Sequence, residues 1–283
     1  MALTKSHNRM IDGSTLNAVD YGAVANGDTN QQPAIQAAIN STYGNEVSTG
    51  NTIDFGRGVF KTSATIEINN SAQTYNVDNI TLQGAGRQST VIDASASTSG
   101  SGIELVKGIF NHVSDLTVLN ATTSGINLES VSNTFACNRN SFDKVQVKSS
   151  GSDGFAFERS YLGKVSGCNS EENALNGFYH NFEIHTSWML DQNYGRLNGT
   201  ADPSAPTFKT GAGFKSDFNV YSAYVANAAD ENRYGYHILG NRGVSFVSNG
   251  AEFNARSGFF FESGVSYEAN WVAGMGNTCG GNN

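Results

Sequence analysis

The chain has 283 residues, which is enough for one large domain with a substantial core. Charged residues make up only 15% and there are 3 prolines, so the composition argues against a disordered chain. The net charge of −8 repels phosphate backbones, and no apolar run approaches the roughly 20 residues that span a bilayer. We therefore expect neither nucleic-acid binding nor membrane insertion.

The three cysteines, Cys137, Cys168 and Cys279, are odd in number and lack the spacing of a metal-binding motif. We therefore expect no disulfide framework, no metal site and no cofactor. The first ten residues lack the apolar segment of a secretory signal, which predicts synthesis in the cytoplasm without a signal peptide.

The first predicted element is an amphipathic helix over residues 29–40. Its apolar residues at positions 34, 35, 38 and 39 follow a helical period. Thr29 or Asn30 would supply the N-cap, and Pro33 falls in the first turn, where its missing N–H is tolerated.

A short pattern of glycine, a large apolar residue and an alternating pair then recurs along the chain, after strand-like segments such as 112–119, 141–147 and 163–168. It begins at seven glycines: Gly102, Gly125, Gly154, Gly177, Gly213, Gly235 and Gly258. Four of the six intervals are 22–23 residues, and the other two hold insertions of about 6 and about 13 residues. This period predicts an all-β parallel solenoid, whose N-terminal end the helix at 29–40 would cap.

Stacked coils place equivalent residues in columns about 4.8 Å apart. The residue after each glycine should face the interior, as should a second column two positions further along. The first interior column is Ile103, Ile126, Phe155, Phe178, Phe214, Tyr236 and Phe259, and the second is Leu105, Leu128, Phe157, His180, Ser216, Ile238 and Phe261. Because strand side chains alternate, the residues between and after these columns should point outward. The first outward column is Glu104, Asn127, Ala156, Tyr179, Lys215, His237 and Phe260, and the second is Val106, Glu129, Glu158, Asn181, Asp217, Leu239 and Glu262.

These patterns divide the chain into four parts. We expect an N-terminal arm at 1–21, the capping helix and first strands at 22–78, the β-helix coils at 79–270, and a Gly/Asn-rich tail at 271–283. The longer insertion is predicted to be a loop at 184–209 that stands off the body of the solenoid.

Several segments are similar to a known family. Residues 17–40, 56–66 and 80–92 resemble the opening segments of the pectate-lyase superfamily, and residues 8–14 resemble the link that precedes this domain in phage tailspikes. The resemblance implies a right-handed parallel β-helix, and it is weak for chemistry because the superfamily includes hydrolases, lyases, epimerases and inert spikes. It further implies a homotrimer located in the virion, acting outside the cell on a bacterial surface polysaccharide, with other phage tail proteins as further partners.

Three outward carboxyls, Glu158, Asp217 and Glu129, are candidates for glycosidase chemistry. Two coils separate Glu158 from Asp217, which allows the carboxyl separation of about 6.5–9.5 Å found in inverting enzymes. Glu129 is one coil from Glu158, nearer the retaining separation of about 5–5.5 Å. Repulsion between stacked carboxylates would keep one of them protonated. The alternative is that all three are ordinary solvent-facing residues. Asp153 precedes a glycine, so we interpret it as a turn residue in preference to a catalytic one.

Two further groups are candidates for binding the sugar. The outward columns supply Tyr179, Asn181, Lys215 and His237, which suit stacking and hydrogen bonding to a glycan. The predicted loop supplies Trp188, Tyr194 and Arg196, which are equally suited to a contact between subunits.

Three classes of function stay open from the sequence. The first is a polysaccharide depolymerase on a phage spike, with hydrolysis favoured over a lyase reaction. The second is a spike that binds glycan without cleaving it, and the third is a cellular pectate-lyase-like enzyme. Release of reducing ends would separate the first class from the second.

Overall fold

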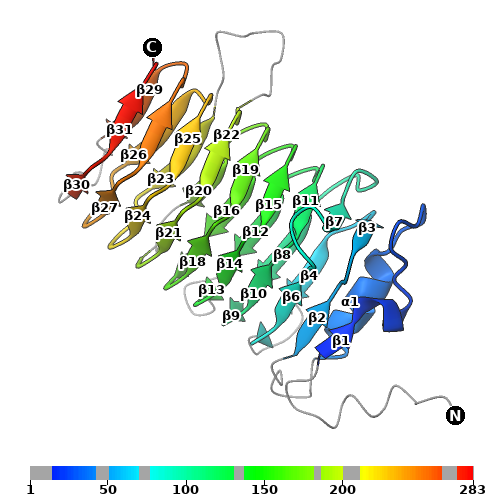
Figure 1. The fold of residues 1–283 in the computed structure, drawn as a ribbon. Helices are drawn as coiled ribbons and strands as arrows, with labels where there is room; N and C mark the ends of the chain where they lie inside the picture. The colour runs from blue at the N-terminus through cyan, green and yellow to red at the C-terminus, as the bar shows by residue number, and fades with distance from the viewer. Residues whose placement is uncertain are drawn as a thin grey trace, which may run out of the picture.

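The computed structural model describes residues 15–42, 51–69, 77–130, 137–181, 186–199, 211–262 and 273–282. Over these residues the chain is a right-handed parallel β-helix, in which successive coils stack from the N-terminal to the C-terminal end (Figure 1). The predicted fold class is therefore confirmed. Within the same residues, no helix has the length and apolar character needed to cross a membrane.

The strands form four parallel sheets, each of which takes one strand from successive coils. The ten-stranded sheet contains β1 (Thr15–Asn17), β2 (Thr52–Asp54), β6 (Thr81–Gln83), β10 (His112–Ser114), β14 (Ser141–Asp143), β18 (Lys164–Ser166), β21 (Met189–Asp191), β24 (Ala223–Val225), β27 (Ser245–Val247) and β30 (Ala273–Met275). The nine-stranded sheet contains β3 (Gly58–Lys61), β7 (Thr90–Asp93), β11 (Thr117–Leu119), β15 (Gln146–Lys148), β19 (Asn169–Glu171), β22 (Tyr194–Arg196), β25 (Ala228–Asp230), β28 (Gly250–Glu252) and β31 (Thr278–Gly280).

The other two sheets are shorter, and isolated bridges through Thr186, Val220 and Arg242 continue the smaller one into later coils. The eight-stranded sheet contains β4 (Ile66–Asn69), β8 (Ile103–Val106), β12 (Ile126–Glu129), β16 (Phe155–Glu158), β20 (Phe178–Asn181), β23 (Ala212–Asp217), β26 (Tyr234–Leu239) and β29 (Ser257–Glu262). The four-stranded sheet contains β5 (Val77–Asp78), β9 (Gly108–Ile109), β13 (Cys137–Asn138) and β17 (Ser160–Tyr161). The glycine pattern misses β4, because Thr65 stands where the later coils have glycine.

The helix α1 (Gln32–Asn40) covers the N-terminal end of the solenoid, after a short 3-10 helix, η2 (Ala18–Tyr21) (Figure 1). Its residues Ile35, Ala38 and Ile39 are buried against the first coil, as the helical period predicts. The capping residue differs from the prediction: α1 follows Gln31, while the Asn30 side chain accepts a hydrogen bond from the Gln32 N–H.

Strand register and burial confirm the predicted interior columns, except that Phe261, at the C-terminal end of the second column, is 46% exposed. Ile103, Ile126 and Phe155 are paired across adjacent strands, and aromatic rings continue the column from Phe155 onward. Successive ring centroids lie 4.9 Å apart between Phe155 and Phe178 and 4.8 Å apart between Phe178 and Phe214. The next two steps, from Phe214 to Tyr236 and from Tyr236 to Phe259, are 4.9 Å and 4.5 Å. The preceding glycines allow this close stacking: a Cβ at Gly154 would overlap the Ser170 hydroxyl and lie 2.7 Å from the Gly177 carbonyl oxygen.

The chain bends between the ten- and nine-stranded sheets at residues with positive φ. These residues are Asp115, Lys144, Gly167, Gln192, Ala226, Ser248 and Gly276, with φ between 49° and 65°. Only two are glycine, and each of the others adopts a backbone conformation disfavoured by roughly 1–2 kcal/mol. The coil stack therefore imposes the bend, which divides the segments predicted at 112–119 and 141–147 into two strands each.

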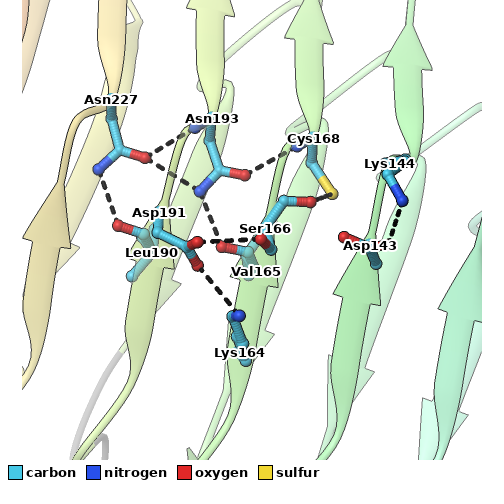
Figure 2. Close-up of polar contacts among 10 residues, drawn as sticks. All are labelled: Asp143, Lys144, Lys164, Val165, Ser166, Cys168, Leu190, Asp191, Asn193 and Asn227. Carbon is cyan, nitrogen blue, oxygen red and sulfur yellow. Dashed lines mark hydrogen bonds and ion pairs between the residues drawn. The ribbon is translucent and has the colours of Figure 1, made fainter.

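Ladders of asparagine side chains satisfy the backbone at these bends. Figure 2 shows one ladder, in which Asn227 Oδ1 accepts hydrogen bonds from the Asn193 backbone N–H (2.9 Å) and side-chain amide (3.0 Å). Asn193 Oδ1 accepts in turn from the Cys168 N–H at 2.9 Å. A second ladder follows the nine-stranded sheet through Asn173, Asn198, Asn232, Asn254 and Asn282. Buried polar groups are stable only when hydrogen-bonded, so each rung fixes the height of the next coil.

The predicted boundaries of the loop and the tail need correction. Residues 189–191 and 194–196 form β21 and β22, which pair in register with strands on both sides. The described part of the predicted loop at 184–209 therefore belongs to a regular coil, and residues 184–185 and 200–209 lie outside the described residues. The tail at 271–283 contributes β30 and β31, which extend two sheets. Most of the predicted arm at 1–21 also lies outside the described residues.

Candidate functional site

A groove of about 620 Å³ lies on the outward face of the eight-stranded sheet, toward its C-terminal end. Strands β20, β23, β26 and β29 supply its floor, and the bends before β16, β20 and β26 supply its wall. The lining residues are Asp153, Leu175, Asn176, Tyr179, Lys215, Arg233, Tyr234, His237, Phe260 and Glu262.

The floor of the groove is the first outward column that the sequence predicts. Tyr179 pairs with Lys215, Lys215 with His237, and His237 with Phe260, so that four successive coils each contribute one side chain. The outward direction of Tyr179, Lys215 and His237 follows from the burial of the residues on either side of each one in its strand, and Phe260 continues the column through its pairing with His237. The structure therefore brings together three of the predicted sugar-binding residues: Tyr179, Lys215 and His237.

Asp217 lies beside this floor. The sequence predicts an exposed carboxyl here, but Tyr179 and Lys215 cover it. The residue is only 8% exposed. The Tyr179 hydroxyl donates a hydrogen bond to Asp217 Oδ2 at 2.7 Å, and Lys215 Nζ lies 3.3 Å from the same oxygen. Lys215 Nζ also lies 4.5 Å from the centre of the Tyr179 ring. A cation and a hydroxyl donor therefore meet the same carboxylate oxygen of Asp217.

Three nearby carboxyls act electrostatically on the Tyr179 hydroxyl. Burial raises the pKa of the Tyr179 hydroxyl, and the charges of Asp217, Asp153 and Glu158 raise it further. The hydroxyl therefore stays protonated and acts as a hydrogen-bond donor. Its environment also shows that Asp153 and Glu158 lie within electrostatic reach of the Asp217 site.

Asp153 lines the groove, although the sequence pattern indicates a turn residue in preference to a catalytic one. It is buried in the groove wall, and its Oδ1 accepts hydrogen bonds from the Asn176 backbone N–H (2.9 Å) and side-chain amide (2.8 Å). Burial raises the pKa of the Asp153 carboxyl despite these hydrogen bonds and the nearby charge of Lys215. The only sequence signal is its place in an Asp-Gly dipeptide before β16, which is typical of a turn.

The C-terminal end of the groove is aromatic. The Tyr234 and Phe260 rings are stacked, with centroids 5.1 Å apart and planes 16° from parallel. His237 packs against both rings and lies 3.1 Å from Glu262 through its Nε2 atom. The Arg233 guanidinium lies 5.2 Å from the centre of the Tyr234 ring.

Four predicted site residues, Glu158, Asp217, Glu129 and Asn181, are not among the groove-lining residues, and of these Asp217 contacts the lining residues Tyr179 and Lys215. Glu158 is half-buried at the end of β16, and Asn181 is half-buried at the end of β20. Glu129 lies one coil further toward the N-terminus and is largely exposed, and partial desolvation of its carboxyl together with the charges of Glu104 and Glu158 raises its pKa. The catalytic role of the two glutamates stays a prediction.

The prediction that Trp188 binds sugar is wrong, because this side chain belongs to the core. Trp188 is 1% exposed, its indole N–H donates to the Ser160 carbonyl oxygen at 3.1 Å, and its ring centroid lies 4.7 Å from that of Phe157. The ring lies over Gly163 of the preceding coil, where a Cβ would overlap it.

Tyr194 and Arg196 are also misplaced by the prediction of a loop. Both lie in β22 of the nine-stranded sheet rather than in the sheet that carries the groove. The Tyr194 hydroxyl donates to Asp230 at 3.0 Å, and Arg196 forms an ion pair with Glu231 at 2.7 Å. These contacts stabilise the coil surface, and neither residue reaches the groove lining.

Among the described residues, no three His, Cys, Asp or Glu side chains gather in a way that would hold a metal ion.

The fold and the groove define a class of protein, the parallel β-helix with a polar groove on one sheet. A family model described as rhamnogalacturonase A/epimerase, pectate lyase-like, matches residues 15–160, slightly more than half of the chain. The chain therefore belongs to this pectate-lyase-like family. Among curated proteins, no sequence matches it.

Solved structures share the fold at low sequence identity. The A-module of the Azotobacter vinelandii mannuronan C-5 epimerase AlgE4 is 14% identical, with a TM-score of 0.59 over 93% of this chain and 96% of that one. The family 28 exopolygalacturonase of Yersinia enterocolitica is 12% identical, with a TM-score of 0.61 over 95% of this chain and 66% of that one. An N-terminal fragment of gene product 12 of bacteriophage Phi29 is 13% identical, with a TM-score of 0.59 over 94% of this chain and 57% of that one.

Proposed function

We propose that the chain binds a bacterial surface polysaccharide in this groove and cleaves it by hydrolysis. The observation that carries the proposal is the presence of two carboxyls in contrasting surroundings at one site. Burial raises the pKa of the Asp153 carboxyl, whereas the Asp217 carboxyl is contacted by the Lys215 ammonium and the Tyr179 hydroxyl. Glycosidases need such a pair, with one carboxyl as acid and the other as base or nucleophile.

In this mechanism Asp153 donates its proton to the glycosidic oxygen as the bond to the sugar ring breaks. Asp217 accepts a proton from the water that attacks the same ring, and Lys215 balances the charge beside it. Glu158, whose charge also raises the pKa of Tyr179, is the second candidate for the proton donor that works with Asp217. The rigid sheet holds these groups in place, which matters because a displacement of about 1 Å can reduce the rate about 100-fold.

The test uses a panel of purified bacterial capsular and O-antigen polysaccharides. Hydrolysis releases reducing ends without the ultraviolet absorbance of an unsaturated uronate, which a lyase would produce. We expect Asp217→Asn and Asp153→Asn each to lower turnover by at least about 100-fold. Glu252→Gln serves as the matched control, because this exposed acid lies in β28 of the nine-stranded sheet and outside the groove lining.

The outcomes separate the candidate functions. Retention of the polysaccharide without cleavage would assign the chain to glycan binding alone. Full activity in both Asp153→Asn and Asp217→Asn, with activity lost in Glu158→Gln, would move the proton donor and base to Glu158 and its neighbour Glu129.

We further propose that the chain acts as a homotrimer in the tail of a phage, with other tail proteins as partners. The resemblance of residues 8–14 to the tailspike link supports this proposal. Light scattering should give three times the mass of one chain at micromolar concentration. A monomer mass would contradict the trimer without affecting the groove chemistry.

A further inference from the structure

The groove is chemically different on the two sides of Asp217. Toward the C-terminus the first outward column continues from Lys215 with His237 and Phe260, and Tyr234 stacks on Phe260. These residues line the groove for three coil spacings beyond Tyr179, which is about 14 Å at the spacing of parallel strands.

Toward the N-terminus the outward face offers no comparable surface. The first column continues as Ala156, Asn127 and Glu104, and none of these residues lines the groove. Glu129 and Glu158 stand in the neighbouring column. The pKa of Glu129 is raised by burial and by the charges of Glu104 and Glu158, which shows that these acids repel one another. A sugar on this side would meet carboxylates instead of an aromatic ring.

We propose that the groove binds the polysaccharide chain on the C-terminal side of the reacting carboxyls only, and that Tyr234 and Phe260 form the platform that anchors it. The inference rests on the proposed function for the position of the carboxyls. Each sugar ring has a face of C–H groups that packs on an aromatic ring, and the stacked pair presents such a surface at the end of the groove. Phe260 is then a specificity-determining residue that holds the chain two coils from Asp217.

A platform remote from the reacting bond binds substrate and transition state equally well. Phe260→Ala should therefore raise KM at least about 10-fold on the polysaccharide, while kcat changes by less than about 2-fold. Phe260→Tyr retains a flat ring and should restore the wild-type KM. A merely structural role for Phe260 would change kcat and stability together.

The experiment measures retention of the same polysaccharide panel in affinity electrophoresis, using the full chain with Asp217→Asn to prevent cleavage. We expect Phe260→Ala in this background to weaken retention at least about 10-fold. Phe253→Ala is the matched control, because Phe253 is a 65% exposed aromatic residue outside the groove lining. Phe260→Tyr in the same background should be retained like its parent.

Failure of the platform and failure of the hydrolytic function give different results. If wild type cleaves a polysaccharide and Phe260→Ala is retained as strongly as the Phe253→Ala control, the platform is overturned and hydrolysis stands. If wild type binds without cleaving and Phe260→Ala loses retention, the platform is supported and hydrolysis is rejected. If wild type retains none of the panel, the platform is overturned as well.

Discussion

The N-terminal and C-terminal halves of the solenoid have the same coil but different interiors. In the first interior column the N-terminal coils stack Ile66, Ile103 and Ile126, whereas the later coils stack aromatic rings from Phe155 to Phe259. The long asparagine ladders also belong to the later coils. A repeated backbone therefore sets where side chains point, while the residue types in each column decide what each half contributes.

The outward face of the eight-stranded sheet changes in the same direction. Glu67, Glu104 and Glu129 give the N-terminal half an acidic surface, and the groove with Tyr179 and Lys215 occupies the C-terminal half. Stacked aromatic rings of the first interior column lie beneath the groove floor, so the half with the aromatic interior carries the candidate site. Substitutions in each half can test whether this division is real.

The largest expected effect is the loss of the indole that joins two coils in the C-terminal half. Trp188→Ala removes a buried ring over Phe157 and Gly163, and we expect the free energy of unfolding to fall by about 3–5 kcal/mol. Urea unfolding followed by circular dichroism measures the change. Tyr221→Ala, at a residue that is 72% exposed, should change it by less than about 0.5 kcal/mol. Equal losses in the two variants would contradict the assignment of Trp188 to the core.

A rung of the asparagine ladder should have the next largest effect. Asn227→Ala leaves the buried Asn193 N–H without its acceptor and should reduce the free energy of unfolding by about 1–3 kcal/mol. Asn127→Ala in the N-terminal half removes a half-buried hydrogen bond to Glu104 and should cost less than about 1 kcal/mol. Urea unfolding of both variants measures the difference. A loss for Asn127→Ala as large as that for Asn227→Ala would show that the ladder has no special role.

The aliphatic column should tolerate a small change in volume. Ile126→Val removes one methylene group from the buried N-terminal column, with an expected loss of about 0.5–1.5 kcal/mol. The measurement is the same urea midpoint, compared with Trp188→Ala in the other half. A loss above about 3 kcal/mol would indicate that the N-terminal core is as tightly packed as the aromatic stack.

The smallest expected effect is a pH dependence of the acidic face. The pKa of Glu129 is raised in the folded chain, so its contribution to stability is present below the unfolded pKa and is lost as the pH rises through the folded pKa. Glu129→Gln should therefore leave stability unchanged below about pH 4 and raise it by less than about 0.5 kcal/mol at pH 7. Glu172→Gln removes an ion pair with Lys148 at 3.0 Å and should not raise stability at pH 7. Thermal unfolding at the two pH values checks both variants, and a gain for Glu172→Gln would remove the distinction between paired and clustered acids.

The sequence by itself determined the coil and the direction of its side chains. Strand alternation and the recurring glycines are local features, so they identify the interior columns and place Tyr179, Lys215 and His237 on one outward face. The helix at the N-terminal end is equally local, because its apolar period lies within a single segment.

Only the tertiary structure decided which of the polar residues form the site. The hydrogen bond from Tyr179 that helps to enclose Asp217 comes from a residue 38 positions away, and Asp153 is held by Asn176, which is 23 positions away. Trp188 lies in a segment whose length suggests a loop in the sequence, whereas the structure pairs its strands β21 and β22 with strands of the preceding coil. Burial and electrostatics depend on contacts between coils, and the spacing of residues within one coil carries no information about which side chain of the next coil will cover a carboxyl.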